Sequence, residues 1–175
     1  QPSPIDIRKL KKIGIKTIVN LRFVTGAGYY LLEKDACEKH NINIINYPLR
    51  SRELPNKDEL LEAKEIIENL DYPCLFHCKS GADRAGFMSA LYFIYKKNDL
   101  QKAIKQLDFK YGHVKKSKTG VLDLFFSEYK YFLESGKKLN FNNWVVKIYD
   151  KDKIQRKHQY SNTLNIILDF IMRRE

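Results

Sequence analysis

Cysteine is scarce in this chain, and that scarcity limits what kind of protein it can be. The sequence contains three cysteines, Cys37, Cys74 and Cys78, an odd number without the spacing of a disulfide framework. A disulfide-stapled secreted domain is therefore excluded. We expect a reducing compartment, either the cytoplasm or the cytoplasmic face of a membrane, in which a free, reactive thiol can persist.

The chain also lacks signals that would place it in several other classes. No apolar run reaches the length of a membrane-spanning helix, and no signal peptide is recognisable. No internal repeat, low-complexity tract, cluster of metal ligands or nucleic-acid-binding motif is present. We therefore expect no metal, no cofactor and no nucleic-acid partner. The chain begins at Gln1 rather than at methionine, so a processed or trimmed product is expected.

Positive charge and apolar residues, by contrast, are plentiful. A chain of 175 residues with 43% hydrophobic residues can bury the core of one domain without stabilising disulfide bonds or metal ions. Its net charge of +11 and its pI near 9.5 favour an anionic partner. Lysine, asparagine and isoleucine are abundant along the whole chain. A general bias in residue usage therefore explains the positive charge equally well.

Hydrophobic periodicity predicts an α/β fold. Three short β-branched or apolar runs are typical of strands, and they are Ile15–Leu21, Ile42–Leu49 and Pro73–His77. Helical patterns lie around them, at residues 4–13, 29–41, 57–70, 87–95, 100–107, 121–133 and 164–171. Strands that alternate with helices and then give way to helices alone predict a sheet covered by a helical C-terminal half. We expect a single domain over residues 1–175, with residues 146–175 as a helical extension packed on it and the charged stretch Tyr149–Asn162 as a solvated connection.

The segment with the most chemical information is HCKSGADRAG, residues 77–86, between a predicted buried strand and a buried helix. A loop from strand to helix points successive backbone N–H groups inward, and the helix N-terminus adds the positive end of its dipole. Gly81 permits a backbone conformation that a side chain would penalise. The predicted phosphate-binding residues are Lys79, Ser80, Gly81, Ala82, Asp83 and Arg84.

A cysteine at the start of such a loop is predicted to be a nucleophile. Electropositive surroundings lower the pKa of a cysteine from about 8.5 by several units, and the thiolate can attack phosphorus. Arg84 enters the first helical turn, from which its planar fork can hold two phosphate oxygens. The alternatives are a buried structural cysteine and a zinc site at Cys74, His77 and Cys78, which lacks a second pair of ligands.

The same segment carries a family resemblance. HCKSGADRAG matches the His-Cys-x5-Arg signature, and the chain resembles cysteine-dependent protein tyrosine phosphatases, in particular bacterial dual-specificity-like members, also over QPSP, IVNLR, YPLRSRELP and YGHVKKSKTGVLD. The resemblance implies a phosphatase-type three-layer fold with a central, mostly parallel sheet of about four to five short strands. It implies Cys78 as nucleophile and Arg84 as phosphate clamp. Similar bacterial proteins often begin with a membrane-anchoring helix, so membrane association through a segment before Gln1 is one expectation.

The chain departs from the family pattern at two places. Ala85 stands where the family usually has Ser or Thr, and Tyr47-Pro48-Leu49 has no acid where the family usually has Trp-Pro-Asp. The leaving oxygen still needs a proton. Asp83 is the favoured donor, by its likeness to the loop of myotubularin-like phosphatases, and Glu53 is the second candidate. A salt bridge or helix cap is an equally good interpretation of Asp83.

Several further residues are candidates for accessory roles. His77 is expected to be a structural neighbour that tunes Cys78, and Cys74 an inert strand cysteine rather than a disulfide partner. Lys79 resembles the loop lysine of phosphoinositide phosphatases. Basic residues outside the loop either hold additional phosphate or form a solvated surface, and they are Arg50, Arg52, His113, Lys115, Lys116 and Lys118.

These features predict a metal-independent phosphomonoester hydrolase with a cysteinyl-phosphate intermediate. The substrate is either a phosphorylated protein, as for tyrosine or dual-specificity phosphatases, or a phospholipid or inositol phosphate. A non-catalytic phosphate-binding module is the alternative from another class. It draws its support from Ala85 and the missing acid, whereas the intact Cys78 and Arg84 speak against it.

Overall fold

A parallel β-sheet lies at the centre of the computed structural model, which describes residues 1–23, 26 and 28–159. Its strands are β1 (Thr17–Asn20), β2 (Asn43–Asn46) and β3 (Cys74–His77), in the order β2-β1-β3. The last residue of β1, Asn20, pairs with the last residues of β2 and β3, Asn46 and His77. The three strands therefore end at one edge of the sheet, which brings the loops that follow them together.

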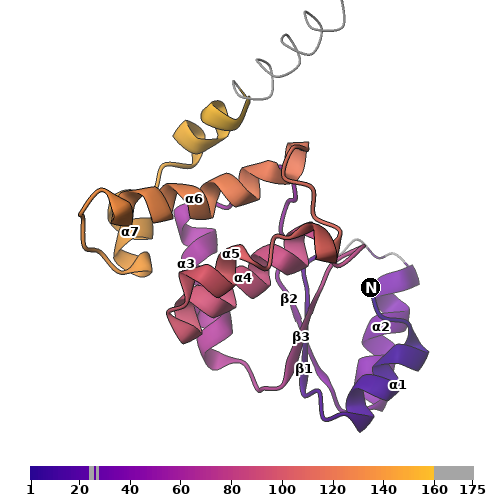
Figure 1. Cartoon of the computed structure of the whole chain (residues 1–175). Coiled ribbons are helices and arrows are strands. Elements are labelled where there is room, and N and C mark those ends of the chain that lie inside the picture. The colour runs from indigo at the N-terminus through magenta and orange to yellow at the C-terminus, as the bar shows by residue number, and fades with distance from the viewer. Residues whose placement is uncertain (24–25, 27, 160–175) are drawn as a thin grey trace, which may run out of the picture.

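Helices cover both faces of this sheet, as Figure 1 shows. Helices α1 (Pro4–Lys12) and α2 (Gly28–Lys39) lie on one face. The other face is covered by a larger group, comprising α3 (Lys57–Asn69), α4 (Asp83–Lys97), α5 (Leu100–Ile104), α6 (Val121–Glu134) and α7 (Phe141–Lys147), with two 3-10 turns at Phe109–Tyr111 and Lys118–Gly120. The predicted three-layer α/β fold with a parallel sheet is confirmed.

The sheet has three strands in the described residues, fewer than the four to five of the resemblance. The chain after β2 stays extended, and Tyr47 and Leu49 donate backbone hydrogen bonds to the carbonyls of Asn20 (2.9 Å) and Leu21 (3.2 Å) without forming a longer regular ladder. After β3 the described apolar segments have helical rather than alternating periodicity, so they fold as helices.

Local sequence signals explain the ends of the first helix. Ser3 Oγ accepts a hydrogen bond from the Asp6 N–H at 3.3 Å, and Asp6 Oδ2 accepts one from the Ser3 N–H at 3.0 Å, which completes a capping box. Gly14 follows the helix with φ +91°. Both ends were predicted.

The protein has a large core on the α4 side of the sheet and a small one on the opposite side. In the large core, Phe87 and Leu91 of α4 pack with Phe125 and Phe126 of α6. The smaller core beneath α1 and α2 contains Cys37, which is fully buried. The prediction of a central, buried helix after the phosphate-binding segment is confirmed by the seven buried residues of α4.

The predicted solvated connection at Tyr149–Asn162 is wrong where the structure describes it. Residues 151–159 are helical, and Tyr149 and Ile154 are buried. The Tyr149 hydroxyl donates to the Pro55 carbonyl at 2.6 Å. The many charged residues around these two apolar residues masked the helical pattern of a segment whose inner side packs on the core. The predicted helix at Leu164–Ile171 lies outside the described residues, and none of the described helices is long and apolar enough to span a membrane.

Candidate active site

The predicted phosphate-binding loop, residues Cys78–Arg84 and called the phosphate loop below, connects the end of β3 to the start of α4. Cys78 is 2% exposed, at the edge where all three strands end. The N–H of Gly81 donates to Cys78 Sγ at 3.3 Å. Gly81 has φ +85°, a left-handed conformation that favours glycine, so the predicted reason for a glycine at this position is confirmed.

The loop lowers the pKa of the Cys78 thiol below that of an ordinary cysteine. Burial of the sulfur is the largest effect and acts in the opposite direction, because it disfavours the thiolate. The backbone N–H groups of Ala85, Gly81 and Ser80 and the charge of Arg84 together outweigh burial. The sulfur therefore carries a thiolate more readily than a free cysteine would.

Arg84 is the second residue of α4, and the ends of two other strands hold its guanidinium. Nη1 donates to the carbonyl of Leu21, after β1, at 3.2 Å, and lies 3.4 Å from the carbonyl of Leu49, after β2. These carbonyls fix the arginine at the edge of the sheet from which Cys78 emerges.

A cleft of about 440 Å³ opens beside Arg84. Its wall combines an aromatic ring with basic side chains from the loop after β2, and the lining residues are Phe23, Leu49, Arg50, Ser51, Arg52, Glu53 and Arg84. The structure thus brings Arg52 and Glu53, both predicted accessory residues, to the same cleft as Arg84. Such a cleft suits an anionic group that is attached to a larger body.

The family model that matches this chain is that of the DSP-PTPase phosphatases fused to NAD+ kinase, PTP-NADK, and the match covers residues 1–121. It includes the whole sheet, the phosphate loop and the cleft. The chain belongs to the PTP-NADK phosphatase family. Its membership confirms the predicted resemblance to cysteine-dependent phosphatases, and it identifies the chain as a phosphatase.

Solved structures share the fold of this PTP-NADK phosphatase at low sequence identity. TpbA of P. aeruginosa is 17% identical, with a TM-score of 0.53, over 91% of this chain and 83% of that protein. A mutant form of Tk-PTP is 21% identical, with a TM-score of 0.56, over 75% of this chain and 89% of that one. A DUF442 protein of Shewanella putrefaciens CN-32 is 15% identical, with a TM-score of 0.53, over 74% and 82%. No curated protein is significantly similar to the chain.

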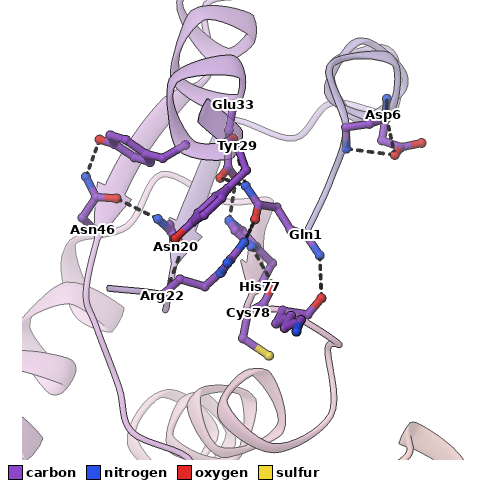
Figure 2. A network of polar contacts seen from close by, with 12 residues as sticks. Gln1, Asp6, Asn20, Arg22, Tyr29, Glu33, Asn46, His77 and Cys78 are labelled. Atoms are coloured by element: carbon purple, nitrogen blue, oxygen red, sulfur yellow. Dashed lines mark hydrogen bonds and ion pairs between the residues drawn. The ribbon is translucent and has the colours of Figure 1, made fainter. Parts of the chain in front are cut away.

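Behind the phosphate loop of this PTP-NADK phosphatase lies a buried polar network, shown in Figure 2. Nε2 of His77 lies 2.5 Å from Oε1 of Glu33, and Nδ1 lies 3.3 Å from the carbonyl oxygen of Cys78. Glu33 Oε2 accepts a hydrogen bond from Gln1 Nε2 at 2.9 Å, and Arg22 contacts the Oε1 of that glutamine. His77 therefore contacts the backbone of Cys78 rather than its sulfur, as expected of a structural neighbour.

Asp83 and His113 form a second polar cluster, next to the loop. His113 Nδ1 lies 2.7 Å from Asp83 Oδ1, and its Nε2 lies 2.5 Å from Asp123 Oδ2. The His113 side chain is fully buried. Asp83 thus makes the salt bridge that was one of its two predicted interpretations, and it does so at the start of α4.

The second predicted proton donor, Glu53, is held by two cations. Lys151 Nζ lies 2.6 Å from its Oε1, and Arg50 Nη1 lies 3.1 Å from its Oε2. Its hydrogen bond with Lys151 is the main reason why the pKa of Glu53 is lowered, and Arg50 acts in the same direction. Glu53 is therefore an anion in this arrangement.

The remaining predicted residues lie at the edge of the site or away from it. Lys79 is exposed in the loop, and its carbonyl accepts a hydrogen bond from the backbone nitrogen of Gln1. Lys115 lies 3.8 Å from Asp123, and Lys116 and Lys118 are exposed. Burial raises the pKa of Cys74 to about 11, and its sulfur is free. In residues 1–23, 26 and 28–159, no group of His, Cys, Asp or Glu is arranged to hold a metal ion.

The residues missed from the sequence include the aromatic wall of the cleft, Phe23, and two carboxylates beside the loop, Glu33 and Asp123. The helical spacing of α2 contained a signal for Glu33. Glu33 lies three and four residues before Ala36 and Cys37 and shares the buried face of the helix with them. A carboxylate on an apolar face predicts a buried polar partner. Asp123 lies in the first turn of α6, where an acidic residue is common at any helix start, so its pattern held no distinct signal.

Proposed function

We propose that this phosphatase hydrolyses phosphomonoesters in two steps through a cysteinyl-phosphate on Cys78. In the first step the thiolate attacks phosphorus, the S–P bond forms, and the P–O bond to the leaving group breaks. The leaving oxygen takes a proton from an acid of the site. In the second step water attacks phosphorus, the S–P bond breaks, and inorganic phosphate and the thiolate are released.

The observation that carries this proposal is the surroundings of the Cys78 sulfur. The N–H of Gly81 lies 3.3 Å away, and the N–H groups of Ala85 and Ser80 and the charge of Arg84 also favour the thiolate. The donors that stabilise a thiolate are suited to stabilise the equatorial oxygens of a phosphoryl group during in-line attack. Arg84 already occupies a fixed position beside the cleft.

The same surroundings support a reaction without a metal ion. The charge of a transferring phosphoryl group is offset by the loop N–H groups, by the N-terminus of α4 and by Arg84. This division of roles needs no Lewis acid, since the nucleophile is activated by its own lowered pKa. A thiolate nucleophile works in a reducing compartment, which is why we propose the cytoplasm or the cytoplasmic face of a membrane.

For the substrate we propose a phosphorylated protein, of the tyrosine or dual-specificity type. The exposed ring of Phe23 lines the cleft beside Arg84, where the ring of a phosphotyrosine can pack. Arg50 and Arg52 in the same wall favour an acidic sequence around the phosphorylated residue. These two arginines equally support the second candidate, a phospholipid or inositol phosphate with more than one phosphate group.

The test is the hydrolysis of an aryl phosphate under reducing conditions with a chelator present, by the wild type and by Cys78→Ser. We expect turnover by the wild type and none by the variant, and quenched wild-type protein should carry phosphate on Cys78 by mass spectrometry. If the wild type binds phosphate but hydrolyses no phosphate ester, the result would support the non-catalytic binding module. The argument for that module is Ala85, which stands where the family usually has Ser or Thr. Phosphotyrosine peptides and inositol phosphates then distinguish the two substrate classes.

A further inference from the structure

The wall of the cleft that follows β2 is held by residues that come much later in the chain. Three successive residues of this wall each contact one side chain of residues 149–155, called the supporting segment below. Lys151 Nζ lies 2.6 Å from Oε1 of Glu53, 98 residues away in the sequence. Oε1 of Gln155 accepts a hydrogen bond from the N–H of Leu54 at 2.8 Å, across 101 residues.

The contacts to the backbone of this wall, residues 50–55, are made where the wall is buried. The Tyr149 hydroxyl donates to the carbonyl of Pro55 at 2.6 Å, and both residues are buried. Leu54, whose N–H donates to Gln155, is 1% exposed. A buried N–H that loses its partner is costly, so the wall depends on these side chains for its backbone conformation.

The ion pair between Lys151 and Glu53 links the supporting segment to the charged side chains of the wall. The Lys151 side chain is 24% exposed and that of Glu53 is 35% exposed, so water screens the pair less than it screens a fully exposed one. The other oxygen of Glu53 lies 3.1 Å from Nη1 of Arg50. Glu53 therefore joins Lys151 to Arg50 through its two carboxylate oxygens.

The wall presents one cation that is free to meet a substrate. Arg50 is paired with Glu53, whereas Arg52 is exposed and has no ion-pair partner among residues 1–23, 26 and 28–159. Both arginines line the cleft beside Arg84. A guanidinium without a partner suits a carboxylate or a second phosphate on the bound molecule. The position of Arg52 depends on the residues directly after it, which the supporting segment holds.

The supporting segment differs in origin from the parts that surround Cys78. All lining residues of the cleft lie within residues 1–121, which match the family model, whereas the supporting segment lies outside them. Arg84 is held by carbonyls at the ends of strands, and Cys78 by the N–H of Gly81 in its own loop. A change in the supporting segment is therefore expected to move the wall and to leave the surroundings of the sulfur in place.

We infer that the supporting segment determines substrate preference, with Lys151 and Gln155 as positioning residues that hold the wall and its free Arg52 beside the cleft. This inference rests on the proposed function. A phosphotyrosine peptide with acidic neighbours extends beyond its ring to the wall, whereas phenyl phosphate ends at the ring. The supporting segment therefore matters more for the peptide than for phenyl phosphate.

Two variants remove the support by different means. Gln155→Leu removes the acceptor for the Leu54 N–H without a change of charge, so long-range electrostatics cannot cause its effect. Lys151→Met removes the ion pair with Glu53, and Lys151→Arg retains it. The matched control for charge is Lys153→Met, since Lys153 is exposed two residues further along the same helical stretch. Gln101→Leu makes the glutamine-to-leucine change at an exposed position of α5.

The experiment measures kcat and KM for phenyl phosphate and for the peptide, well below the melting temperature of each variant. In Gln155→Leu and Lys151→Met we expect KM to rise about 10-fold for the peptide and to stay within about 3-fold for phenyl phosphate. The kcat values should change less than KM, because the wall meets the substrate away from the reacting atoms. Lys151→Arg, Lys153→Met and Gln101→Leu should follow the wild type with both substrates.

Hydrogen exchange gives a second measurement that does not depend on activity. The amides of residues 50–54 should exchange faster in Gln155→Leu and Lys151→Met than in wild type, and those of the phosphate loop should not change. Faster exchange with unchanged KM values would reduce the supporting segment to a stabilising contact. If Gln155→Leu does not fold, Lys151→Met decides, because it alters a partly exposed side chain.

The remaining outcomes separate this inference from the proposed function. Equal rises in KM for both substrates would overturn the inference, and so would a wild type that hydrolyses phenyl phosphate but not the peptide. A wild type that hydrolyses neither substrate would reject the proposed function. The Kd values of the peptide and of inorganic phosphate then decide on the supporting segment, and equal changes in the two would overturn its role.

Discussion

Glu33 and His77 meet behind the phosphate loop, with Oε1 of the glutamate 2.5 Å from Nε2 of the histidine and both side chains buried. Glu33 belongs to α2 and His77 ends β3, so the contact joins the helix layer to the strand that carries Cys78. A buried carboxylate is costly unless it is paired, which makes this contact a condition for the fold around the loop.

Glu33→Gln should therefore destabilise the protein although it preserves the shape of the side chain. Replacing one partner of a buried polar pair leaves the other poorly satisfied, at a cost of about 1 to 3 kcal/mol in the free energy of unfolding. Urea denaturation measures it. The control is Glu38→Gln on the same helix, whose exposed partner Lys34 lies 3.8 Å away, and it should change stability by less than about 0.5 kcal/mol. Equal losses in the two variants would contradict the role given to Glu33.

Alkylation of the cysteines should be selective for Cys78. The pKa of Cys78 is lowered by the loop N–H groups and Arg84 despite its burial, whereas burial raises the pKa values of Cys37 and Cys74 to about 11. Only the thiolate reacts, so the rate of Cys78 alkylation should rise with pH with a midpoint below about pH 8.5, the midpoint of an ordinary cysteine. Mass spectrometry after iodoacetamide treatment locates the label. Label on Cys37 or Cys74 before Cys78 at neutral pH would disprove the assignment.

Arg84→Lys should separate charge from shape at the proposed phosphate clamp. Lysine preserves the positive charge near Cys78 but has no planar fork for two phosphate oxygens. We expect kcat/KM for an aryl phosphate to fall by roughly 10²-fold or more. The pH dependence of Cys78 alkylation should move little, because the charge is retained. Arg156→Lys, on the exposed side of the helical residues 151–159, is the matched control and should leave kcat/KM unchanged. Similar kcat/KM values for Arg84→Lys and wild type would argue against bidentate binding of two phosphate oxygens by Arg84.

Gly86→Ala tests how closely α4 approaches the chain after α5. A Cβ at this position would lie 2.8 Å from the Gln106 carbonyl oxygen and 3.2 Å from the Leu107 side chain. Because backbone must shift, we expect a loss of about 1 to 3 kcal/mol in the free energy of unfolding. A Cβ at Gly28, at the start of α2, meets nothing within 4 Å, so Gly28→Ala should be neutral or stabilising by up to about 1 kcal/mol. Thermal melts of the two variants give the comparison, and a Gly86→Ala protein as stable as wild type would refute the close contact.

The phosphate loop could be predicted from the sequence because its parts are contiguous. Cys78, Gly81 and Arg84 lie within one turn between a strand and a helix, and the strand and helix were each evident from their own periodicity. Their spacing therefore determines which groups meet, whatever the rest of the fold does.

The partners of the loop could not be predicted, because they come from distant parts of the chain. Asp123 meets His113 only after α6 packs beside α4, and Glu33 reaches His77 only through the pairing of β1 with β3. No short-range pattern encodes these distances. The prediction of a solvated connection around Tyr149 was wrong for a related reason. Two buried apolar positions among many charges are too few to give a periodic signal.

The alignment of the three strand ends has a consequence for how this protein can change over evolution. Cys78 and the phosphate loop depend on β3 and α4, whereas the walls of the cleft, Phe23 and residues 50–53, follow β1 and β2. Insertions or substitutions in the connections that follow β1 and β2 alter which substrates the cleft accepts. They leave the phosphate loop and both hydrophobic cores in place. Grafting the connections of another phosphatase onto this sheet is therefore a route to a new substrate preference with the same chemistry.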